Sequence, residues 1–116
     1  MYILKLDHTF SAAHQLTNAY DDKCNDSIHG HNWKVKVSIE VKELNNGMVI
    51  DFTNIKEIID TLDHKNLNEI LDFEPTAENL ARYIHNKISA INWNKRNPRI
   101  KVEIFEAEKS SIIYLE

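Results

Sequence analysis

Strict alternation of apolar and polar residues between Trp33 and Val41 is the pattern that most constrains the fold of this chain. Every odd position in this stretch is apolar, and lysine, serine or glutamate occupies each position between them. Because successive side chains of a strand point to opposite faces of a sheet, the pattern predicts a strand with one buried face. A less regular alternation over residues 3–14 predicts a second strand that ends at His14.

Two segments in the middle of the chain have helical periodicity instead. The first places apolar residues at i, i+3, i+4 and i+7 from Ile55, and we expect Thr53 or Asn54 to cap it. The second begins near Thr76, its expected N-cap. Alternation returns in residues 100–106 and again in the final SSIIYL, which predicts two more strands.

The expected order of elements is therefore ββααββ within a single domain, residues 1–116. Runs of strands separated by runs of helices are typical of α+β proteins, so we expect a mostly antiparallel four-stranded sheet with both helices on one face. The Asn45-Asn46-Gly47 stretch should form a tight turn, because Asn and Gly tolerate the positive φ that such turns require.

Charge and composition exclude several classes of function. The formal net charge of −4 and the lack of any Lys/Arg cluster argue against a nucleic-acid partner. No apolar run is long enough to cross a membrane, and the N-terminal MYILKLDHTF does not have the pattern of a secretory signal. We therefore expect a cytoplasmic protein that binds neither nucleic acid nor membrane. The single cysteine excludes an intrachain disulfide.

The histidines are the first candidates for chemistry. His29 and His31 are two residues apart and would share one face of a strand, and His14 at the end of the other early strand could supply a third imidazole. Three neutral imidazoles with an open fourth position are the composition of a catalytic zinc site. A His-x-His pair is also common as two ordinary polar residues at a strand end, and spacing alone leaves both interpretations open. His8 and His85 are expected to be solvated or hydrogen-bonded.

Other titratable residues fit a proton-transfer site but have ordinary alternatives. Cys24 lies near His29 in sequence, so it is either a thiolate beside the metal or an inert buried thiol. In the Asp63-His64 pair the carboxylate could orient the imidazole, although such a pair is also common in solvated turns. Glu106 continues an apolar face, and a buried carboxylate needs a partner, either a ligand with N–H donors or an internal cation.

Seven features occur together in one order along the chain. They are FSAAHQL (10–16), Cys24, HGHNWKV (29–35), GMVIDF (47–52), LDHKNLN (62–68), PTAENLA (75–81) and Glu106. In this combination the chain resembles the 6-pyruvoyl-tetrahydropterin synthase / 6-carboxytetrahydropterin synthase family over nearly its whole length.

The resemblance implies a tunnelling fold (T-fold), in which each subunit contributes a four-stranded antiparallel sheet with two helices on one side. It also implies that three subunits join their sheets into a barrel and that two trimers stack as a homohexamer, with active sites between subunits. By the same resemblance the enzyme is a carbon–oxygen lyase that needs Zn²⁺ and no redox cofactor.

The resemblance also implies roles for individual residues. His14, His29 and His31 would bind zinc. Cys24, Asp63 and His64 would transfer protons. Glu106 would accept hydrogen bonds from the pterin, and Thr76, Ala77 and Glu78 would hold the edge of the pterin.

The implied substrate is 7,8-dihydroneopterin triphosphate. The short chain and GMVIDF favour 6-carboxytetrahydropterin as product, with acetaldehyde and triphosphate released, in queuosine and deazapurine biosynthesis. The spacing between Cys24 and His29 is intermediate between the carboxy-forming and pyruvoyl-forming branches, so 6-pyruvoyltetrahydropterin is the alternative product. A non-catalytic pterin- or zinc-binding protein of the same fold is a third hypothesis.

Overall fold

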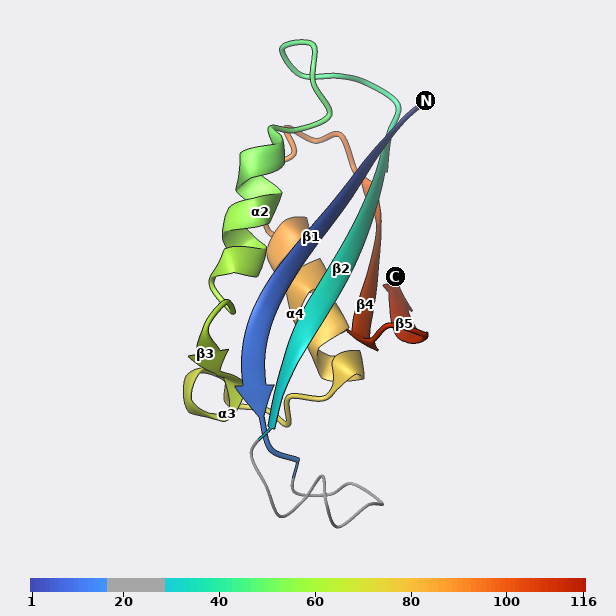
Figure 1. Cartoon of the computed structure of the whole chain (residues 1–116). Helices are drawn as coiled ribbons and strands as arrows, with labels where there is room; N and C mark the ends of the chain where they lie inside the picture. Colours follow the sequence, from blue (N-terminus) through green and yellow to red (C-terminus); the bar gives the residue numbers. More distant parts are fainter. Residues whose placement is uncertain (17–28) are drawn as a thin grey trace.

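A computed structural model describes residues 1–16 and 29–116, and it contains a five-stranded sheet with helices packed against one face (Figure 1). In chain order the elements are β1 (Tyr2–His14), β2 (His29–Val41), α2 (Phe52–Asp60), β3 (Lys65–Asn66), α3 (Leu67–Ile70), α4 (Ala77–Ser89), β4 (Arg99–Ala107) and β5 (Ser110–Leu115). The predicted α+β class is confirmed. None of the helices in these two ranges is long and apolar enough to span a bilayer.

The strands of the sheet follow the order β3-β1-β2-β4-β5. The four longer strands β1, β2, β4 and β5 pair with one another in antiparallel fashion, as predicted. Strand β3 is an addition to the prediction, and it pairs in parallel with Ala12 and Ala13 of β1. The β1–β2 ladder runs without a shift from Tyr2 opposite Val41 to His14 opposite His29. This register brings the end of β1 and the start of β2 together.

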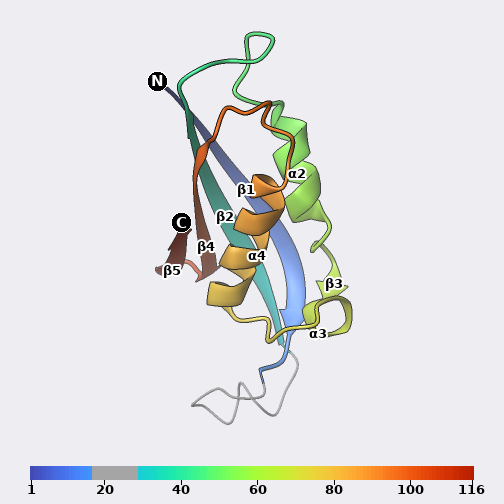
Figure 2. The ribbon, with the colours of Figure 1, turned by 180° about the vertical axis from the view of Figure 1, so that it is seen from behind.

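The core lies between the sheet and its helices. The two views in Figures 1 and 2 place α2 and α4 on the same face of the sheet, with α4 behind β1 and β2 in Figure 1. The predicted apolar face of β2 is buried along its whole length, and Trp33, Val35 and Ile39 have no exposed surface. Ile84 of α4 is equally buried. Removal of these apolar groups from water is the main source of stability.

Local signals at turns and helix ends agree with the prediction at two of three positions. Asn46 and Gly47 have φ values of 53° and 77°, as a tight hairpin turn requires. Thr76 caps α4, and its side chain accepts a hydrogen bond from the Asn79 backbone N–H. The cap of α2 differs from the prediction, because Asp51 rather than Thr53 or Asn54 occupies that position. An aspartate oxygen accepts hydrogen bonds from both the Thr53 N–H and its hydroxyl.

Candidate active site

Three histidines converge where β1 ends and β2 begins. His14 faces His29 across the ladder, and His31 lies opposite Ala12, one step further along the same face. One ring nitrogen of each histidine lies within 4.8 Å of those of the other two, and the Nε2 atoms of His14 and His29 are 3.1 Å apart. The structure therefore brings the three predicted metal ligands together on the face covered by the helices.

The ring of His14 is fixed by its surroundings. The side chain is fully buried, and its Nδ1 donates a hydrogen bond of 2.8 Å to the carbonyl oxygen of Pro75, just before α4. The ring also packs edge-on against Trp33, whose indole N–H donates to the Ala12 carbonyl. Because a carbonyl only accepts, Nδ1 must carry a hydrogen. The Nε2 atom is therefore the one that faces the other histidines.

One atom of this cluster has no ordinary partner. His31 Nε2 is buried, and no residue in the described part of the chain forms a hydrogen bond with it. The closest charged oxygen is Oε2 of Glu106, at 3.8 Å. A buried polar atom without a hydrogen bond is unfavourable, and coordination to a metal ion would satisfy it. The donor set of three imidazoles, with the orphaned nitrogen among them, fits a zinc ion.

Glu106 lies at the edge of the histidine cluster. Its Oε2 is 3.1 Å from His14 Nε2, and its side chain is 39% exposed, so it is half-buried rather than fully inward-facing as its parity predicted. A shift in strand register between Phe105 and Ala107 accompanies this orientation. The hydrogen bond with His14, supported by the positive potential of the histidines, holds the Glu106 pKa below its ordinary value. The carboxylate is therefore an ionised acceptor.

The histidine pKa values move in opposite directions for identifiable reasons. Burial opposes the charged form of His14, but the hydrogen bonds to Glu106 and the Pro75 carbonyl outweigh it and raise the His14 pKa. Burial lowers the pKa of His31, and the neighbouring charge of Glu106 does not compensate for it. A neutral imidazole is the form that binds a metal, so His31 is available as a ligand near neutral pH.

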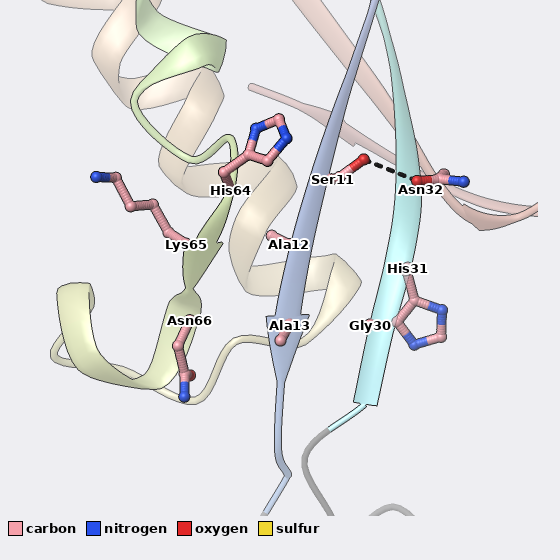
Figure 3. A pocket seen from close by; sticks show the side chains of 9 residues that line it. All are labelled: Ser11, Ala12, Ala13, Gly30, His31, Asn32, His64, Lys65 and Asn66. Carbon is pink, nitrogen blue, oxygen red and sulfur yellow. Dashed lines mark hydrogen bonds between the residues drawn. The ribbon is translucent and has the colours of Figure 1, made fainter.

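Asp63 and His64 form a pair, as predicted, but they lie apart from the three histidines. An Asp63 oxygen is 2.9 Å from His64 Nδ1, and the His64 side chain is 83% exposed. Figure 3 shows His64 beside β3 on one side of β1, and His31 beyond it at β2 on the other side. Strand β1 separates the pair from the metal-ligand cluster within one chain.

An open cavity of about 480 Å³ extends over the strands between these groups. Its lining consists of Ser11, Ala12, Ala13, Gly30, His31, Asn32, His64, Lys65 and Asn66 (Figure 3). A hydrogen bond of 2.7 Å from the Ser11 hydroxyl to the Asn32 side chain crosses its surface. Polar groups from β1, β2 and the 64–66 segment are therefore accessible to a small molecule.

The remaining predicted residues differ in how far the structure places them. Thr76 directly follows Pro75 and lies beside the histidine cluster, and Ala77 and Glu78 form the first turn of α4. Cys24 lies outside the described residues. The roles of these four residues stay predictions, whereas the positions of Thr76, Ala77 and Glu78 at the start of α4 are observed.

Sequence reasoning missed two residues, Pro75 and Ser11, whose backbone groups hold this region in place. The Pro75 carbonyl orients His14. The Ser11 backbone N–H donates a hydrogen bond of 2.8 Å to a carboxylate oxygen of Asp63. Ser11 also accepts from the His64 backbone N–H at 2.6 Å. Backbone partners carry no residue-type signal, so no sequence pattern could have identified these contacts.

The Asp63–Ser11 contact gives the protein a pH-dependent component of stability. The Ser11 N–H holds the Asp63 pKa below its ordinary value, so the ionised form stabilises the fold above the unfolded-state pKa of about 4 and this contribution is lost as pH falls through the folded-state pKa. Asp63→Asn should therefore be less stable than the original protein at pH 6, and the difference should shrink at pH 3. Urea unfolding at both pH values measures it.

A charge control separates this contact from a general electrostatic effect. Glu108→Gln removes a negative charge from the exposed turn between β4 and β5. Two results would contradict the specific role of the Ser11 N–H. The first is a stability difference between Asp63→Asn and the original protein that does not change with pH, and the second is the same pH-dependent loss of stability in Glu108→Gln.

Comparison with known proteins identifies relatives of the whole chain. The family model described as 6-pyruvoyl tetrahydropterin synthase matches residues 3–116. A relative from Archaeoglobus fulgidus, provisionally named a 6-carboxy-5,6,7,8-tetrahydropterin synthase, is 37% identical over 102 residues, which cover 84% of this chain and 85% of the relative. The structure of Caenorhabditis elegans 6-pyruvoyl tetrahydropterin synthase is 32% identical, with a TM-score of 0.71 and coverage of 100% and 97%.

A third relative carries a different activity in its name. The dihydroneopterin monophosphate aldolase of Pyrococcus furiosus is 40% identical over 67 residues, which cover 54% of this chain and 57% of that protein. All three names contain a reduced pterin, which is a tetrahydropterin in the two synthases and dihydroneopterin monophosphate in the aldolase.

Proposed function

The chain belongs to the 6-pyruvoyl tetrahydropterin synthase family of enzymes, and we propose that it converts 7,8-dihydroneopterin triphosphate to 6-carboxy-5,6,7,8-tetrahydropterin, with release of acetaldehyde and triphosphate. The cluster of His14, His29 and His31 is the observation that carries this proposal. The product would feed queuosine and other deazapurine biosynthesis.

The proposed metal is zinc, held by the three histidines through ring nitrogens that face one another. When bound, zinc would act as a Lewis acid that acidifies the side-chain hydroxyls of the substrate. The protein prepares the site for it, since the Pro75 carbonyl fixes the His14 ring and the unpartnered nitrogen of His31 is directed into the cluster.

Glu106 is the proposed anchor of the pterin ring. Its ionised carboxylate can accept two hydrogen bonds from adjacent N–H groups of the pyrimidine ring, and its partial exposure leaves it accessible to a ligand. Thr76, Ala77 and Glu78 would hold the ring edge from the first turn of α4. These positions would place the substrate side chain next to the three histidines, where its hydroxyls react.

The proposed proton transfers involve Cys24 and the Asp63–His64 pair. The Cys24 thiolate would accept a proton from the substrate side chain, and His64 would serve as the complementary acid and base. The Asp63 carboxylate stays ionised through its hydrogen bond from Ser11 and accepts one from His64 Nδ1. That contact leaves His64 Nε2 free to exchange a proton with the substrate.

The proposed active site lies between subunits of a homohexamer built from two stacked trimers. In one chain the Asp63–His64 pair is exposed and separated from the histidine cluster by β1, so a pair from a second copy would complete the site. Two sheet edges support such an assembly. Within the described residues, β5 has no strand beyond it, and β1 between Tyr2 and Ser11 has β2 as its sole strand partner.

The bond that is broken distinguishes the proposed reaction from two alternatives. The 6-pyruvoyl product retains every carbon of the side chain, whereas the carboxy product does not. Carbon–carbon cleavage of dihydroneopterin monophosphate is the alternative suggested by the Pyrococcus furiosus relative. Incubation of the zinc-loaded oligomer with each substrate, followed by mass analysis of the pterin, separates the three reactions.

Two outcomes of this experiment would count against the proposal. A 6-pyruvoyl product, or turnover of the monophosphate alone, would replace the carboxy reaction with one of the alternatives.

Cys24→Ala is the catalytic control, and it should retain zinc and pterin binding while turnover is lost. Turnover unchanged in Cys24→Ala would exclude the thiolate from the mechanism.

A further inference from the structure

The side chain of Asn79 connects the first turn of α4 to the segment before it. Its Nδ2 donates a hydrogen bond of 2.9 Å to the carbonyl oxygen of Glu74, and its Oδ1 accepts a hydrogen bond of 3.2 Å from the Arg82 side chain. The same Glu74 carbonyl accepts a second hydrogen bond, of 2.9 Å, from the Thr76 backbone N–H. The turn that contains Pro75 is therefore held at the Glu74 carbonyl by two donors, of which one is the amide of Asn79.

This turn carries the atom that orients a proposed metal ligand. Pro75 is buried, and its carbonyl oxygen accepts the hydrogen bond of 2.8 Å from His14 Nδ1. A carbonyl can hold an imidazole in one tautomer only while its own position is fixed. Pro75 has no backbone N–H with which to fix itself, so its neighbours must do so. The Asn79 side chain bonds to one of these neighbours, Glu74.

We propose that Asn79 is a positioning residue for the metal centre: by fixing the Glu74–Thr76 turn, its amide keeps the Pro75 carbonyl on His14 and the Nε2 atom of His14 directed at the metal. The inference rests on the proposed metal role of His14. It concerns a residue whose hydrogen bonds join it to Glu74, Thr76 and Arg82 and not to a histidine of the cluster.

The identity of the residue supports this role. Asn79 is the third residue of α4, where a glutamate or glutamine often bonds back to the N-cap N–H and where negative charge favours the helix dipole. Here the Thr76 N–H is already bonded to Glu74, so a capping-box residue would have no donor to satisfy. A carboxylate at this position could not donate to the Glu74 carbonyl. Asparagine gives up the dipole benefit but supplies that donor.

The discriminating variant is Asn79→Asp, which has nearly the same shape and adds helix-favouring charge but replaces the donating amide with an acceptor. Co²⁺ affinity, measured by competition with a chelator, is expected to fall about tenfold, in the range typical for loss of outer-shell support. Thermal unfolding should change little. Asn79→Ala, which removes the donor without adding charge, should weaken Co²⁺ binding in the same direction.

Asn86→Asp is the matched control, because it places the same charge on an exposed position of the same helix, and its Co²⁺ affinity should be unchanged. Selective ¹⁵N labelling of histidine gives a second measurement in the metal-free protein at alkaline pH. The original protein should show His14 with its proton on Nδ1, and both Asn79 variants should show increased Nε2 protonation.

The possible results separate this inference from the proposed function. Unchanged Co²⁺ affinity together with an unchanged His14 tautomer in both Asn79 variants would overturn the positioning role and leave the metal site intact. If the original protein bound no Co²⁺ or Zn²⁺, the proposed function would fail, and the His14 tautomer would still decide whether Asn79 acts on this ring.

Discussion

His29→Ala is expected to purify without stoichiometric zinc and to have no measurable turnover, while its fold is retained. Removal of a direct ligand should weaken metal binding by more than the roughly 100-fold upper range for loss of outer-shell support. His29 is the suitable ligand to replace because it is partly exposed at the first residue of β2. His14 is fully buried, so its replacement would also disturb packing.

The measurements for His29→Ala are metal content per subunit and thermal unfolding. His8→Ala is the matched control, since His8 bonds to Asp60 on the side of α2 and lies outside the cluster. This control should bind zinc like the original protein. Unchanged zinc stoichiometry in His29→Ala would refute the three-histidine assignment, and loss of zinc in His8→Ala would indicate that metal content depends on general stability.

Local periodicity predicted the parts of the fold that depend on amphipathic faces. The alternation from Trp33 onward placed the inner face of β2 correctly, and the same parity carried His31 and His14 onto one side of the sheet. The register of β1 against β2 was not needed to predict that these two histidines lie on the same side of the sheet. That register then sets His14 opposite His29, where β1 ends and β2 begins.

The segment 62–68 shows where sequence reasoning reached its limit. It contains β3 and part of α3, and neither was predicted, because two residues paired to Ala12 and Ala13 produce no periodicity. The Asp63-His64 pair was identified from residue types alone. Its position on the far side of β1 depends on backbone contacts with Ser11, which are long-range and independent of side-chain identity.

The two caps illustrate the same limit on a smaller scale. Thr76 was predicted correctly because Thr is a strong N-cap and a helical stripe follows it. For α2 the prediction named Thr53 or Asn54, and it did not consider Asp51, an equally good N-cap residue that occupies the position. Residue type could not choose among three acceptors within four positions, because the choice depends on where the preceding chain enters the helix.

Mixing two inactive variants is expected to restore activity if the active site is shared between subunits. His29→Ala disables the metal-ligand cluster, and His64→Ala disables the proton-transfer pair on the other side of β1. After co-expression or joint refolding at equal amounts, random assembly should give about a quarter of the original activity, because each site draws the two halves from different copies in a head-to-tail contact.

The control for this experiment is a mixture of His29→Ala with His31→Ala, two variants of the same cluster. No site in that mixture can combine three intact histidines, since all three come from one chain. It should stay inactive at every ratio. If activity returns in the mixture of His29→Ala with His64→Ala and not in the control mixture, one copy must supply the histidine cluster and another copy must supply the Asp63–His64 pair. Inactivity of both mixtures, with oligomers formed, would place the complete site within one chain and overturn the shared arrangement.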